Sequence, residues 1–339
     1  MVSQGMLLKT LDLLTTSPKA EIETLGSGAP TRVNRARNII DQDNIVAVGI
    51  SEKVSENTST GLLAITFYVD KKKPIKKLSA EEVIPPALLL DVSSQPVPTD
   101  VIAIGRPKLE AKAPWVKRKP IQPGNSIGHV KVTAGTLGAI VKKNGQYYLL
   151  SNSHVLARSG KAKKGDKILF PGKADGGTAN ADVIGELADF VAFQVGGEMI
   201  NRSDCAIALP LPERLADLVS DIKILGVPKG ITKPKRGMKV TKAGRTTHVT
   251  KGEIKDVNFR MTLPYPDGVG TVGFLDQVFC SRYSDGGDSG SLVLEVESKK
   301  AVGLHFAGYP DAHGVQGSVF NPIKDVLDPL GVKLVTKTI

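Results

Sequence analysis

Cysteine is scarce in this sequence of 339 residues, because Cys205 and Cys280 are the only two. So few thiols argue against a framework of several disulfides and favour a reducing compartment with both thiols free. A single bridge between the two cysteines stays open as the alternative, because the sequence does not give the distance between their Cβ atoms. No run approaches the roughly 18 apolar residues that a membrane-spanning helix requires. The stretch from Met6 to Leu14 is interrupted by polar residues and lacks a secretion cleavage site, so it predicts a short amphipathic helix. We therefore expect a cytoplasmic protein without membrane contacts.

Aromatic residues are also few, at 5%, whereas the formal net charge is +11. Basic clusters lie at residues 71–77, 106–119, 161–167 and 229–245, and an acidic partner such as a nucleic acid is one hypothesis for them. No aromatic residues interleave with these lysines, as they do in proteins that bind single strands, so solvated loops and linkers are the preferred interpretation. His, Cys and carboxylate residues do not recur at ligand spacing, so no metal site is predicted.

The chain is long enough for two domains, because single cores rarely exceed roughly 250 residues. Residues 1–110 combine the helical stretch with β-rich runs at 44–50 and 61–70, and predict a small α+β domain. Two roles stay open for this domain: regulation, or assembly of the chain into a homo-oligomer. Residues 111–123 are rich in proline and positive charge and predict a linker. Over residues 124–339, short apolar strands alternate with turns, which predicts a barrel or sandwich that ends in a helix.

Three separated motifs carry the residue types of nucleophilic catalysis. The run GGDSGS, residues 286–291, places Ser289 in a glycine-rich turn, where the amides of Gly287 and Ser289 can form an oxyanion hole. A serine hydroxyl is a poor nucleophile at neutral pH, so it needs a base and a group that orients the base. Of the five histidines, His154 follows a buried strand in LLSNSHVLA and is the predicted base. Asp204 directly precedes an apolar strand and is predicted to accept from the Nδ1 of that base.

In the chain order His154, Asp204, Ser289, these motifs resemble the chymotrypsin-like serine peptidases, whose triad runs His, Asp, Ser. The resemblance implies a mainly β protein with a double six-stranded β-barrel over residues 124–339 and a cleft between the barrels. It also implies a serine endopeptidase that acts on protein or peptide substrates through an acyl-enzyme and needs no cofactor. Runs such as PTDVIAIG and GRTTHVTKGEI are similar to the trypsin-like proteins of bacteria and plants that include the narrow-leaf type.

One departure from the trypsin pattern concerns Asp288, next to the predicted nucleophile. The sequence shows no secretion signal and no activation site whose new N-terminus could pair with this carboxylate. A buried carboxylate without a partner is costly. We therefore predict either an internal donor for Asp288 or an exposed, mobile loop.

The resemblance also suggests a specificity pocket. In these peptidases the strand after the nucleophile lines the main pocket, and here it spans residues 302–308. His305, Ser284, Phe306 and Gly308 are the candidate pocket residues. An imidazole can donate to a Glu carboxylate or a Gln amide, so Glu or Gln is expected before the scissile bond. The alternative is that His305 is a packed strand residue.

Two rival functions stay open. The first is a latent or inactive peptide-binding scaffold that uses the same cleft, with the N-terminal domain occluding it or mediating assembly. The second is a basic protein associated with nucleic acid, for which Lys233, Lys235 and Arg236 would supply the contacts.

Overall fold

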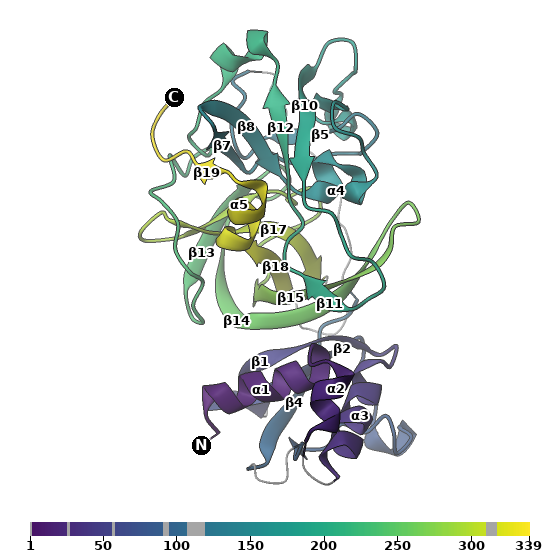
Figure 1. Ribbon diagram of the computed structural model, residues 1–339. Coiled ribbons are helices and arrows are strands. Elements are labelled where there is room, and N and C mark those ends of the chain that lie inside the picture. Colours follow the sequence, from purple (N-terminus) through teal and green to yellow (C-terminus); the bar gives the residue numbers. More distant parts are fainter. Residues whose placement is uncertain (1, 26–27, 56–57, 91–94, 107–118, 310–316) are drawn as a thin grey trace.

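The protein consists of a small N-terminal unit below two β-barrels (Figure 1). The computed structural model describes residues 2–25, 28–55, 58–90, 95–106, 119–309 and 317–339. Within them the chain is mainly β, and the α+β character expected for its first part is confirmed.

The N-terminal unit, residues 2–106, packs three helices against a sheet (Figure 1). Its elements are α1 (Gln4–Thr15), α2 (Lys19–Glu23), α3 (Ala29–Ile40), β1 (Ile45–Ser55), β2 (Thr58–Val69), a 3₁₀ turn η1 (Ile75–Lys77), β3 (Ala87–Leu88) and β4 (Val97–Ala103). Ser3 caps α1 by accepting the Met6 amide at 3.2 Å. Leu7, Leu11 and Leu14 recur at helical spacing and are buried in the core of the unit, as the amphipathic prediction requires.

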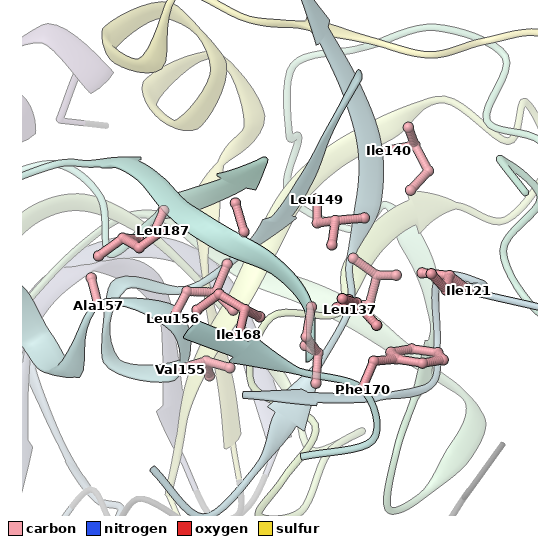
Figure 2. Packing of buried hydrophobic residues seen from close by; sticks show 14 of the residues in the cluster. Ile121, Leu137, Ile140, Leu149, Val155, Leu156, Ala157, Ile168, Phe170 and Leu187 are labelled. Carbon is pink, nitrogen blue, oxygen red and sulfur yellow. The ribbon is translucent and has the colours of Figure 1, made fainter. Parts of the chain in front are cut away.

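The first barrel is built from short strands around the core that Figure 2 shows. Its strands are β5 (Ser126–His129), β6 (Gly135–Thr136), β7 (Ala139–Lys143), β8 (Gln146–Ser151), β9 (Lys167–Leu169), β10 (Val183–Phe190), β12 (Ala206–Pro210) and β19 (Lys333–Leu334). Among the described residues they pair in the order β19–β7–β8–β12–β10–β9–β5–β6. Short helical segments connect them: α4 (Ser153–Leu156), η2 (Arg158–Gly160), η3 (Lys173–Asp175) and η4 (Pro212–Asp217). Leu137, Leu149 and Phe170 are fully buried inside.

The second barrel is a closed ring. Its strands are β13 (Lys239–Gly244), β14 (His248–Tyr265), β15 (Gly270–Ser281), β16 (Leu292–Glu295), β17 (Ala301–Tyr309) and β18 (Gly317–Pro322), and α5 (Ile323–Leu330) follows. In the described part of the chain they pair in the order β15–β18–β17–β16–β13–β14, and a further β14–β15 pairing closes the ring. The short strand β11 (Met199–Asn201) adds to β15. Apart from the two-residue strands β6 and β19, each barrel has six strands, so the predicted double six-stranded β-barrel is confirmed.

A continuous sheet joins the N-terminal unit to the second barrel, which the sequence does not predict. β1 pairs antiparallel with β14, and Val48 lies opposite Arg260. Most of the predicted linker falls in residues 107–118, which lie outside the described residues, and Ile121 is buried in the core of the first barrel. Backbone pairing therefore fixes the N-terminal unit against β14.

Candidate active site

His154 lies on α4, a single helical turn that follows β8. The next three residues, Val155, Leu156 and Ala157, belong to the core of the first barrel and anchor this turn (Figure 2). The imidazole is 11% exposed. The packing of its neighbours thus holds the ring in place while one part of it stays accessible.

Asp204 is fully buried just before β12 and holds His154 by two contacts. Its Oδ2 lies 2.6 Å from His154 Nδ1, and its Oδ1 accepts the His154 backbone N–H at 3.1 Å. Tyr265, at the end of β14 in the other barrel, donates its hydroxyl to the same Oδ2 at 2.8 Å. Burial and the charge of Asp204 raise the pKa of Tyr265 well above its usual value, so the phenol stays a donor. Sequence reasoning missed Tyr265.

Ser289 lies between β15 and β16, in the loop that faces the first barrel. Its carbonyl accepts the Thr136 amide at 2.8 Å, and a side chain at Gly135 would meet both this carbonyl and Val155, the neighbour of His154. The loop of Ser289 and the turn that carries His154 therefore lie close together where the two barrels meet. The Ser289 Oγ donates to the Phe306 carbonyl at 3.4 Å, and within the described residues no hydrogen bond joins it to His154.

Gly287 gives the loop its shape. Its φ of +92° lies in the region that favours glycine, and a Cβ there would collide with the guanidinium of Arg245 and the hydroxyl of Thr246. Among the hydrogen bonds of the described residues, the amides of Gly287 and Ser289 donate to no acceptor of the chain. Both predicted oxyanion donors are thus available.

Asp288 is fully buried and has an internal partner, so the first of the two predicted alternatives is confirmed. Lys242 of β13, itself fully buried, places its Nζ 3.0 Å from Asp288 Oδ2. The amides of Thr246 and Thr247 donate to Oδ1 at 2.9 and 3.1 Å. The turn between β13 and β14 therefore braces the loop that carries Ser289.

Burial acts differently on the two partners of this pair. It lowers the pKa of Lys242, although the charge of Asp288 acts in the opposite direction. Burial alone would raise the pKa of Asp288, but the charge of Lys242 and the hydrogen bonds from Thr247 hold it below its usual value. Rising pH therefore breaks this ion pair by removing the Lys242 proton, at a lower pH than lysine usually requires.

Replacing Lys242 with methionine is expected to lower the free energy of unfolding by about 3–5 kcal/mol, because it leaves Asp288 buried without its counter-charge. Denaturant unfolding measures this. The matched control is Lys239→Met on the same strand, since Lys239 is an exposed lysine paired with Glu253 and should change stability by about 1 kcal/mol or less. Equal effects of the two changes would contradict the proposed brace.

The candidate pocket residues divide between two faces of β17. His305 is 3% exposed, and its Nδ1 lies 3.4 Å from the hydroxyl of Tyr283. Ser284 Oγ lies 2.7 Å from Ser318 Oγ, and a Cβ at Gly308 would be 3.7 Å from the same Ser284 oxygen. The Phe306 side chain is instead buried in the aromatic core of the second barrel, at the irregularity of the β17–β18 pairing between His305 and Ala307. Residues 310–316, which follow this strand, lie outside the described residues.

Other kinds of site find little support. In the described ranges no three His, Cys, Asp or Glu side chains are grouped as metal ligands. None of the helices in these ranges is long and apolar enough to cross a membrane. Cys205 and Cys280 are buried free thiols, and burial raises the pKa of Cys205 to about 12.

One family model and several solved structures are similar to parts of this chain. Residues 212–338 match the model of peptidase family S64. Solved structures that are similar to this chain include a glutamic acid-specific serine protease (18% identity, TM-score 0.47). Protease A of Thermobifida fusca (21%, 0.46) and a chymotrypsin of Cellulomonas bogoriensis (19%, 0.44) are also similar. The first alignment covers 63% of this chain and 100% of the other; the next two cover 64% and 99%. No curated protein matches.

Proposed function

We propose that this chain, a serine endopeptidase of the chymotrypsin-like fold, hydrolyses peptide bonds with Ser289 as nucleophile, His154 as base and Asp204 as the group that orients the base. The observation that carries the proposal is the double contact of Asp204 with His154 next to the loop of Ser289. An acceptor at Nδ1 leaves Nε2 free to take a proton. The hydroxyl of Tyr265 adds a third donor to the Asp204 carboxylate.

One small movement precedes the reaction. Ser289 Oγ must leave the Phe306 carbonyl and turn towards His154, and rotation about a single side-chain torsion is the simplest way. Catalytic hydrogen bonds are often long or misaligned before substrate binds. The amides of Gly287 and Ser289 would then receive the oxyanion of the tetrahedral intermediate.

The preferred substrate carries Gln or Glu before the scissile bond. The support is the buried polar cluster of His305 on β17, Ser318 on β18, and Tyr283 and Ser284 after β15. Burial lowers the pKa of His305 to about 3, so the ring is neutral at working pH. A neutral imidazole offers one donor and no charge, which suits the amide of Gln at least as well as the carboxylate of Glu.

Peptides that differ only in the residue before the scissile bond test this preference. We expect kcat/KM for Gln and Glu to exceed that for Lys and Leu by at least about tenfold, the value of one well-placed hydrogen bond. Because His305 stays neutral from pH 5 to 8, the ratio of Gln to Glu should stay constant over that range. Cleavage chiefly after Lys, Arg or large apolar residues would refute the pocket assignment.

Covalent labelling tests the activity itself. A fluorophosphonate probe should modify the folded full-length chain once, and peptide mapping should find the adduct on Ser289. Heat-unfolded protein is the control and should not react. The missing hydrogen bond between Ser289 and His154 favours the rival reading of a latent peptide-binding scaffold. Folded protein that binds peptides but leaves Ser289 unmodified would support that rival.

A further inference from the structure

The backbone around Asp204 is held by two buried amide side chains of the second barrel. The Asp204 N–H donates to Asn321 Oδ1 at 3.1 Å, and Asn321 Nδ2 donates to Gln277 Oε1 at 2.6 Å. Gln277 Nε2 donates in turn to the carbonyl of Arg202 at 2.9 Å. Asn321 and Gln277 are fully buried. The segment 202–204 of the first barrel is therefore fixed to β15 and β18.

A bulge in β15 adds a second attachment to the same segment. The register of β14 and β15 shifts just before Gln277, and Asp276 there has a φ of +53°, which is uncommon for a residue other than glycine. The Asp276 carboxylate lies 3.0 Å from the guanidinium of Arg202. It also lies 3.7 Å from the guanidinium of Arg260 on β14. The unusual conformation thus places one carboxylate between two arginines.

Arg260 carries the contact on to the N-terminal unit. Its side chain is 4% exposed, and its Nη2 donates to Asp12 on α1 at 2.6 Å. Its Nη1 donates to the hydroxyls of Thr15 and Thr16 at the end of the same helix. One buried guanidinium therefore connects α1 with the bulge that holds Arg202.

We propose that α1 is a positioning element for Asp204, acting through Arg260, Asp276 and Arg202, so that the N-terminal unit supports catalysis by keeping Asp204 in register with His154. This inference rests on the catalytic role proposed for Asp204. None of the connecting side chains touches the reacting atoms, and each acts on the next by a direct contact. A shift of α1 would be passed to residues 202–204, because the buried amides leave that segment little freedom to adjust.

The test compares two ion pairs that cross the same seam in the full-length chain. Arg260→Gln removes the pair described above, whereas the control Arg236→Gln removes the pair of Arg236 with Glu52, at 3.8 Å. We expect Arg260→Gln to lower kcat about tenfold with KM unchanged, which is a typical coupling between distant groups. The control should change neither constant. Asp12→Asn changes a half-exposed residue and should give a smaller fall in kcat if Arg260→Gln does not fold.

A double mutant separates positioning from simple stabilisation. If Arg260 acts through Asp204, Arg260→Gln should lower the residual kcat of Asp204→Asn by less than about twofold, because coupled residues are not additive. A full tenfold loss in that background, an equal loss in Arg236→Gln, or an unchanged kcat in Arg260→Gln would each overturn the inference. Wild-type protein without hydrolysis or Ser289 labelling would instead refute the proposed function.

Discussion

Replacing Ser289 with alanine is expected to lower kcat on the order of 10⁶-fold, the largest effect of any single change in this chain. Without Oγ no acyl-enzyme can form. Proton transfer by His154 and its orientation by Asp204 then no longer contribute to the rate. The oxyanion amides of Gly287 and residue 289 remain, and they should leave a rate roughly 10³- to 10⁴-fold above that of the uncatalysed reaction. Steady-state hydrolysis of a Gln-containing peptide measures the loss.

The matched control is Ser298→Ala, which removes a serine hydroxyl in the turn between β16 and β17. It should leave kcat and KM unchanged. A Ser289→Ala protein that keeps its native unfolding midpoint and still hydrolyses peptide within tenfold of wild type would contradict the role of Ser289.

Replacing Asp204 with asparagine is expected to lower kcat by about 10⁴-fold. The carboxylate accepts from both the backbone N–H and the Nδ1 of His154, which fixes the tautomer that leaves Nε2 unprotonated. An asparagine amide in this place donates as well as accepts. The backbone N–H of His154 still needs an acceptor at the Oδ1 position, so the NH₂ group takes the Oδ2 position and is directed at the imidazole. The ring then carries its proton at Nε2 and cannot take one from Ser289.

Pre-steady-state kinetics with an ester substrate should place this loss in the acylation step. Asp189→Asn is the control, because Asp189 lies on β10 of the same barrel, where its carboxylate pairs with the exposed Lys164 at 2.8 Å and accepts the Phe190 amide at 3.1 Å. It should keep wild-type rates. Comparable losses in the two variants would mean that general damage to the barrel, rather than the orientation of His154, explains the effect.

Local sequence patterns predict much of the fold and the proximity of His154 to Asp204. Both residues flank apolar strands, and a strand end next to polar residues is a local signal. The helix at α1 follows from leucine spacing in the same way. α3 was not predicted, because only Ala29, Val33, Ala36 and Ile39 mark its buried face among several charged residues.

The residues that sequence reasoning missed depend on long-range register. Tyr265 reaches Asp204 only because the β14–β15 pair closes the second barrel beside the first. Lys242 is one of 45 lysines and arginines, and nothing in its neighbourhood in the sequence marks it as buried. β1 and β14 lie far apart in the sequence, and no local pattern predicts that these two strands pair. The position of Arg260 between α1 and β15, which follows from this pairing, therefore cannot be predicted from the residues around it.

The cation that pairs with Asp288 is the ammonium group of Lys242, a residue of β13. The ion pair that supports the loop of Ser289 therefore forms when the second barrel folds. A cut that creates a new N-terminus is therefore not needed to supply a cation for Asp288. Extra sequence fused ahead of Met1 would, for the same reason, be compatible with turnover.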